Sequence, residues 1–156
     1  DWIFSFKSEL LLPANLIKRA KCGALNFHPS PPKYRGIGGY ILALRNLDKQ
    51  FGVTCHHMNS MIDSGQIIMT SYFKVKEDET VLSLYHKSAF HCLRLLFDVV
   101  DLICLDEQLP QSNEKWGRQL FKYAEFQKGL EILKSVDHKG STPSYKIAFA
   151  VKDDNL

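Results

Sequence analysis

The 156-residue sequence lacks a long apolar run and lacks any strong excess of charge. A bilayer-spanning helix needs about 20 consecutive apolar residues, and no stretch approaches that length. The first residues, DWIF, do not resemble a signal peptide. Lys and Arg number 20 against 17 Asp and Glu and are scattered along the chain. The sequence therefore predicts neither membrane association nor a dedicated nucleic-acid surface.

Cysteine is scarce, and none of it is arranged as a CxxC pair. The density is far below that of a disulfide-stapled domain, so the cysteines are predicted to be reduced core residues of a cytoplasmic protein. Nor do the histidines suggest a metal: His86 and His91 lie about 140° apart around a predicted helix, and no zinc-type spacing occurs. The four cysteines are Cys22, Cys55, Cys92 and Cys104.

What is present is an ordinary globular composition, 45% hydrophobic and 24% charged, at a length typical of one domain. Its first half alternates strand and helix patterns, which favours an α/β unit with a parallel sheet. The first helix is expected to run for two to three turns, with Pro13 in its first turn and Gly23 as its end cap. Strands are expected at 1–6, 24–27, 51–58 and 66–75, and helices within 8–23 and 40–48.

The second half opens with one long apolar-faced pattern over residues 79–104, which predicts a largely buried helix. Residues 105–118 are polar and are expected to form an exposed connection. A short helix over 124–134 and a last strand over 145–151 are expected to follow. We therefore expect a catalytic core over 1–104 and an extension over 105–156. Because the chain has no initiating Met and opens in an apolar strand, it is expected to be the interior of a longer protein.

Polar residues collect near the predicted strand ends, where open α/β sheets bind their ligands. Asn26 and His28 share one side of an extended segment, because side chains repeat with period two. For the same reason only one of His56 and His57 can enter a cleft, and Asp63 follows in a turn. The alternative also stands: Asn26 satisfies a turn, and His28 is a hydrogen-bonded core histidine.

Other motifs have simpler explanations. Residues 36–39, GIGG, are not followed by the Lys and Ser/Thr of a phosphate loop, so they predict a flexible entry to a helix. Trp116 and Arg118 in the polar connection fit either a ligand edge or a surface tryptophan that pins the loop.

Two segments carry a resemblance. LNFHPSPPKYRG (25–36) and GVTCHHMNSMIDSGQII (52–68) resemble the hallmark of the folate-dependent formyltransferases, which act on glycinamide ribonucleotide, methionyl-tRNA and sugar amines. Residues 1–75 carry the match. The tail over 109–133 resembles the segment after the catalytic domain of sugar-amine members. Too little chain follows residue 135 for a tRNA-binding barrel, so a methionyl-tRNA substrate is disfavoured.

The resemblance implies a Rossmann-like sheet with helices on both faces, with the N-terminal half of the sheet missing from these residues. It also implies formyl transfer from N10-formyltetrahydrofolate to a primary amine of a small molecule, here expected to be a nucleotide-linked amino sugar, without a metal. Asn26 would donate to the developing oxyanion. His28 would accept the amine proton or, in its charged form, would support the oxyanion and later protonate the leaving folate nitrogen. Asp63 would orient and tune His28.

The resemblance further implies where the ligands lie. The proline-rich loop would hold Asn26 and His28 still at the cleft. Tyr34, Arg35 and Gly36 would shape a substrate wall, with His56 as secondary support. The expected folate-binding residues are Phe4, Ser5, Phe6, Lys7, Met61, Ile62 and Ser64.

Two other functions stay open at this point. The same Asn-His-Asp set could activate water in a formyltetrahydrofolate deformylase, which would release formate without an amine. Alternatively, the chain could be a catalytically idle folate- or nucleotide-binding fragment. A homodimer also stays open.

Overall fold

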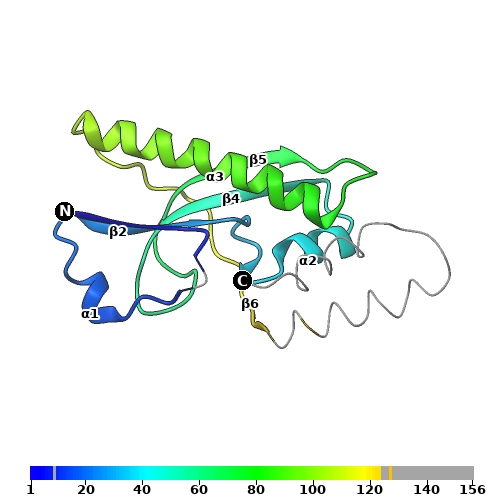
Figure 1. The fold of residues 1–156 in the computed structure, drawn as a ribbon, viewed down its shortest axis with the longest axis horizontal. Coiled ribbons are helices and arrows are strands. Elements are labelled where there is room, and N and C mark those ends of the chain that lie inside the picture. The colour runs from blue at the N-terminus through cyan, green and yellow to red at the C-terminus, as the bar shows by residue number, and fades with distance from the viewer. Residues whose placement is uncertain (9, 124–126, 128–156) are drawn as a thin grey trace, which may run out of the picture.

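The computed structural model describes residues 1–8, 10–123 and 127, which form a four-stranded sheet, a two-stranded sheet and three helices (Figure 1). The larger sheet has the order β1-β2-β4-β5, and the smaller pairs β3 with β6. The strands are β1 (Trp2–Phe6), β2 (Gly23–His28), β3 (Arg35–Gly36), β4 (Gln50–His57), β5 (Ile67–Lys74) and β6 (Leu120–Phe121). The helices are α1 (Ala14–Ile17), α2 (Gly39–Arg45) and α3 (Val81–Cys104).

The larger sheet is mixed, so the prediction of a parallel sheet was wrong. Only β1 and β2 run parallel, whereas β2–β4 and β4–β5 are antiparallel. The β4–β5 connection, residues 58–66, is shorter than the dozen or so residues that a parallel crossover needs. The antiparallel register places His56 opposite Asn26 and Thr54 opposite His28.

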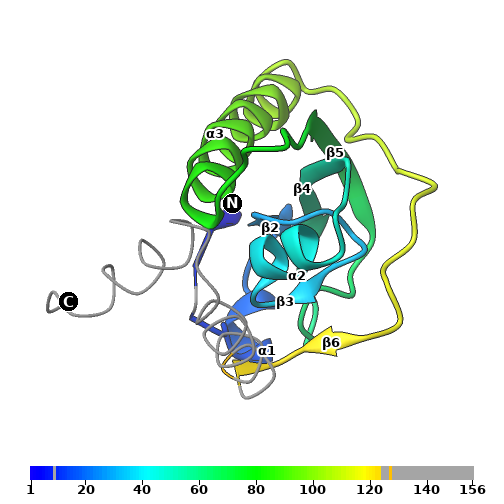
Figure 2. The ribbon, with the colours of Figure 1, turned by 90° about the vertical axis from the view of Figure 1, so that its right-hand side faces the viewer.

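The main core lies between α3 and one face of the sheet. Figures 1 and 2 show α3 running along that face, and Figure 1 shows α1 on the other side. Apolar side chains alternate along β2 and β4, so every second residue points toward α3. The opposite face is left for polar side chains. The buried core residues are Leu25, Phe27, Val53, Cys55, Ile68, Cys92, Leu95 and Val99.

Helix α3 is buried on one face only, contrary to the prediction of a largely buried helix. It begins at a capping box in which the Thr80 side chain accepts from the Ser83 N–H. Its apolar residues extend well beyond the stripe that one sheet face can cover. Among the described residues, Phe90 and Phe97 on its outer side are therefore exposed by 60% and 58%.

Two other expectations need correction. Helix α1 is a single turn rather than two or three, and Gly23 begins β2 instead of ending that helix. Of the four cysteines, Cys55 and Cys92 are buried as predicted, and burial raises the pKa of each thiol to about 12. Cys22 and Cys104 are exposed, because they lie beyond the packed faces.

Residues 105–119 form the predicted connection and lead to β6, which pairs with β3. The helix expected over 124–134 and the strand expected over 145–151 lie outside the described residues, apart from residue 127. Among the described helices, none is long and apolar enough to cross a membrane.

Truncation of the core under α3 should destabilise the fold. Leu95 is 2% exposed, and we expect Leu95→Ala to lower the free energy of unfolding by about 2–5 kcal/mol. Leu93→Ala is the matched control on the same helix, since Leu93 is 43% exposed, and should change it by less than about 0.5 kcal/mol. Urea unfolding measures both, and equal losses would contradict the assigned core.

Candidate active site

The predicted polar residues meet on the sheet face that α3 does not cover. Asn26 and His28 alternate with the core residues of β2, so they share this face as predicted. His56 joins them from β4, because the antiparallel register aligns it with Asn26. Asp63 comes from the loop after β4, and its carboxylate lies 3.4 Å from both histidines. The structure therefore brings all four together.

His28 is held in one orientation by the main chain. Its Nε2 lies 2.8 Å from the Tyr34 carbonyl oxygen, which can only accept, so Nε2 carries the hydrogen. In the neutral ring Nδ1 is then the free basic nitrogen, 3.4 Å from Asp63 Oδ2. Burial lowers the pKa of His28 below its ordinary value, and this outweighs the opposing effect of Asp63. The ring is thus a neutral base near neutral pH.

Asp63 is buried but remains ionised. Burial alone would raise the pKa of its carboxyl, yet His56, His28 and the Gly36 N–H together hold that pKa below its ordinary value. The Gly36 N–H donates to Oδ2 at 2.7 Å. Asp63 has a positive φ of 42°, which is uncommon for a non-glycine residue and occurs where surrounding contacts fix the backbone.

Arg35 supplies those contacts. Its Nε donates to the Asp63 carbonyl oxygen at 2.6 Å and its Nη2 to the Ile62 carbonyl oxygen at 2.9 Å. The guanidinium therefore ties the loop to β3 and keeps the Asp63 carboxylate at the histidines. A glycine follows at residue 36, where a Cβ would lie 2.1 Å from the Phe121 carbonyl oxygen.

His56 orients Asn26. The His56 Nδ1 lies 2.8 Å from the His57 carbonyl oxygen and so carries the hydrogen. Its Nε2 then accepts from Asn26 Nδ2 at 3.1 Å. One amide hydrogen of Asn26 is used in this bond, and the second stays available to a ligand. His57 faces the other way, as the alternation along the strand requires.

The residues of β1 that were expected to bind folate lie on both faces of the sheet. Ser5 pairs with Asn26 and is buried on the site face. The rings of Phe4 and Phe6 instead contact Phe27 on the α3 side of the sheet and remain partly open to solvent, with exposed fractions of 41% and 38%. Lys7 lies over the Tyr85 ring of α3 at 3.7 Å. Direct contacts of this segment with a ligand on the site face would therefore involve Ser5 and the backbone.

The loop that carries Asp63 presents apolar side chains to solvent. Met61 and Ile62 are exposed by 64% and 37%, which suits a flat aromatic ligand. Ser64 Oγ instead donates to Asn59 Oδ1 and stabilises the turn. The role of these residues in folate binding stays a prediction.

The predicted substrate wall is mainly structural support. The Tyr34 ring is buried beside Phe51, and its hydroxyl donates to Asp48, so only its carbonyl reaches the site. Arg35 and Gly36 hold Asp63, as described above. Their contact with a substrate stays a prediction.

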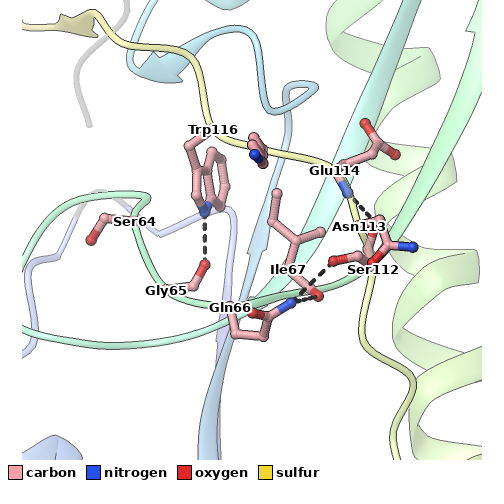
Figure 3. Close-up of a pocket in the computed structure, with 9 residues that line it drawn as sticks. Ser64, Gly65, Gln66, Ile67, Ser112, Asn113, Glu114 and Trp116 are labelled. Carbon is pink, nitrogen blue, oxygen red and sulfur yellow. Dashed lines mark hydrogen bonds between the residues drawn. The ribbon is translucent and has the colours of Figure 1, made fainter.

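Trp116 is a site residue that the sequence singled out without deciding its role. It is half-buried, and its indole lies edge-on to His56, with ring centroids 4.8 Å apart. Figure 3 shows its N–H donating to the Gly65 carbonyl oxygen, at 2.7 Å. A cavity of about 400 Å³ opens beside it. Its lining comprises Ser64, Gly65, Gln66, Ile67, Ser112, Asn113, Glu114, Lys115 and Trp116.

Gly65 allows the loop to approach β4. A Cβ there would lie 1.8 Å from the His57 carbonyl oxygen, a backbone atom that already accepts from His56. We expect Gly65→Ala to lower the free energy of unfolding by about 1–3 kcal/mol, because the loop must shift. Thermal unfolding measures the loss. Ser60→Ala on the exposed part of the loop is the control, and equal stabilities of the two variants would contradict the close approach.

Comparison with known proteins bears directly on this site. A family model described as formyl transferase matches residues 2–100, which include Asn26, His28, His56 and Asp63. The chain belongs to the formyl transferase family. Among the described residues, no group of three or more His, Cys, Asp or Glu side chains is placed to hold a metal ion.

Curated relatives in this family are longer than the chain. It is 36% identical over 104 residues to the bifunctional polymyxin resistance protein ArnA of Wigglesworthia glossinidia brevipalpis, covering 66% of this chain and 16% of that protein. It is 32% identical over 101 residues to GDP-perosamine N-formyltransferase of Brucella melitensis biotype 1, covering 64% of this chain and 39% of the relative. The chain thus spans well under half of either relative.

Solved structures confirm the family fold. A 4-N formyltransferase from Francisella tularensis has a TM-score of 0.71 at 25% identity, with 82% of this chain and 52% of that chain covered. The formyltransferase PseJ from Anoxybacillus kamchatkensis, in complex with UDP-4,6-dideoxy-4-formamido-L-AltNAc and tetrahydrofolate, has a TM-score of 0.70 at 26% identity. That alignment covers 85% of this chain and 70% of PseJ. The expected Rossmann-like α/β class is therefore correct.

Proposed function

We propose that this chain transfers a formyl group from N10-formyltetrahydrofolate to the primary amine of a nucleotide-linked amino sugar. The observation that carries the proposal is the buried His28, whose free Nδ1 faces the ionised Asp63 beside Asn26. This arrangement supplies a neutral base, a carboxylate to stabilise the protonated base, and an amide donor.

His28 is the proton acceptor. Attack of an amine on a formyl carbon requires the nitrogen to lose a proton, and Nδ1 is the nitrogen of His28 that has a free lone pair. When Nδ1 takes up the proton, the imidazolium forms next to the Asp63 carboxylate. The imidazolium and the Asp63 carboxylate form an ion pair, because Nδ1 and Oδ2 lie 3.4 Å apart. The site is buried, where charge interactions are strong. The imidazolium then gives that proton to the folate N10 as the bond between the formyl carbon and N10 breaks, so that tetrahydrofolate leaves and the neutral ring is restored.

Asn26 stabilises the oxygen of the reacting formyl group. A donor that is already oriented where negative charge develops lowers the barrier without reorganisation. His56 fixes the Asn26 amide through one hydrogen and leaves the second free. Removal of one such donor typically costs about 10²–10³ in kcat.

The chemistry of the site and the names of the relatives support the choice of the two substrates. Met61 and Ile62 offer exposed apolar surface next to Asp63 for the folate ring. The names of the relatives point to a sugar amine as acceptor: GDP-perosamine N-formyltransferase is one, and PseJ was solved with a UDP-linked formamido sugar and tetrahydrofolate. We further propose that residues 1–104 form the catalytic core and that 105–156 extend it.

The test is a transfer assay with 10-formyltetrahydrofolate and a panel of nucleotide-linked amino sugars. The proposal predicts a formamide product on at least one of them, detected by mass spectrometry. Formate release without an amine acceptor would instead indicate a deformylase. Folate binding with neither product would indicate a chain that binds without catalysing transfer.

A further inference from the structure

The segment after α3 returns across the molecule and closes one side of the active site. We name residues 112–121 the strap. Its first part is tied to β5, where the Ser112 N–H donates to the Ile67 carbonyl oxygen at 2.9 Å and Thr70 and Tyr72 donate to Glu114. Figure 2 shows this segment leading from the α3–β5 side to β6 beside β3.

Its second part is tied to the proline-rich loop. The Gly117 N–H donates to the Pro32 carbonyl oxygen at 2.9 Å, and β6 pairs with β3. The glycine is required there, because a Cβ would lie 2.5 Å from the Lys33 carbonyl oxygen. Trp116 is thus placed between two anchored points, and it lies beyond residues 2–100, which the family model matches.

The Trp116 indole points inward from a strap whose adjacent side chains Glu114 and Lys115 are exposed. It lies edge-on to His56 at 4.8 Å and 87°, and its centroid is 6.0 Å from that of His28 at 61°. Its N–H is satisfied by the Gly65 carbonyl oxygen, so the part of the indole that lies near the two imidazoles is apolar.

We propose that Trp116 is a positioning residue that shields the His28 and His56 imidazoles from water and so keeps His28 in its neutral, proton-accepting form. The role of His28 as a base rests on the proposed function, but the shielding itself does not. A protonated imidazole loses more solvation than a neutral one when water is excluded, which is why burial by Trp116 favours the neutral ring.

The groups around His28 define what removal of Trp116 should change. Asp63 faces Nδ1 and favours the charged ring, as does the Tyr34 carbonyl at Nε2, whereas His56 disfavours it. The Arg35 guanidinium donates to the main-chain carbonyl oxygen of Asp63. None of these groups is contributed by Trp116. Loss of the indole therefore admits water while the charges stay, and the pKa of His28 should rise.

The experiment is an NMR titration of the histidine ring protons in the intact protein, with the His28 signal assigned from the spectrum of His28→Gln. In the wild type His28 should titrate below 6.5. Trp116→Ala should raise that midpoint by about 0.5–1 pH unit. Trp116→Phe, which keeps the apolar edge, should restore the wild-type value. Trp2→Phe is the matched control, since Trp2 packs at the main core, and should leave it unchanged.

An unchanged His28 midpoint in folded Trp116→Ala would overturn the proposal, as would an equal shift in Trp116→Phe. If Trp116→Ala does not fold, Trp116→Gln replaces it and should give the same upward shift. These spectra need no substrate, so absence of formyl transfer by the wild type would count against the proposed function alone. Where transfer is measured, Trp116→Ala should move the acidic limb of kcat to higher pH with little change in KM.

Discussion

The His28→Ala variant is expected to transfer formyl groups about 10²-fold more slowly than the wild type, or slower still. The reason is that Nδ1 of His28 is the free nitrogen facing Asp63, so the substitution removes the group that takes the amine proton. His56 cannot replace it, because its Nε2 is bonded to Asn26. Single-turnover kinetics with saturating donor and acceptor measure the loss.

Two controls separate this effect from damage to the fold. His28→Ala also removes the bond to the Tyr34 carbonyl, worth about 1 kcal/mol, so its unfolding must be measured alongside. His57→Ala is the second control. His57 follows His56 on β4 but faces away from the site, so this variant should keep nearly full activity. A folded His28→Ala variant that turns over like the wild type would remove His28 from the mechanism.

Asp63→Asn is expected to lower kcat/KM by about 10²-fold while leaving the loop in place. The amide keeps an oxygen that can accept from the Gly36 N–H, but it removes the charge that stabilises the His28 imidazolium. Asp63 raises the pKa of His28, so its neutralisation should lower that pKa further. The acidic limb of the pH profile should therefore move to lower pH, opposite to the shift expected for Trp116→Ala.

Asp48→Asn is the matched control for this change. Asp48 is a partly buried carboxylate that accepts from Lys33 and from the Tyr34 hydroxyl, away from His28. Asp48→Asn should lower the free energy of unfolding but leave the pH dependence of kcat/KM unaltered. A full-rate Asp63→Asn enzyme, or the same altered profile in both variants, would contradict the assigned role of Asp63.

The sequence predicts much of this site because the relevant rules are local. Period two in β2 places Asn26 and His28 on one face, and the same alternation separates His56 from His57. The resemblance then links Asp63 to them across the chain. The structure adds the tautomers, since only the Tyr34 and His57 carbonyls decide which ring nitrogens carry hydrogen.

What could not be predicted depends on contacts that are distant in sequence. The alternating pattern does not give strand direction, and the long connection between β2 and β4 allows either direction, so the antiparallel β2–β4 pair could not be predicted. The short β4–β5 connection did indicate an antiparallel pair, and the prediction overlooked it. The exposed side of α3 was missed because apolar content alone does not show how many faces a neighbour covers. Trp116 reaches His56 only through a strap anchored at Pro32 and Ile67, and no local rule predicts those anchors.

The most direct test of the central claim traces an isotope-labelled formyl group from 10-formyltetrahydrofolate in the presence of a nucleotide-linked amino sugar. The Asn26, His28 and Asp63 arrangement predicts that the label appears in a sugar formamide with the wild type and is nearly lost with His28→Ala. Label found only in formate, or transfer that is unaffected by His28→Ala, would contradict the account of this site as a formyl-transfer centre.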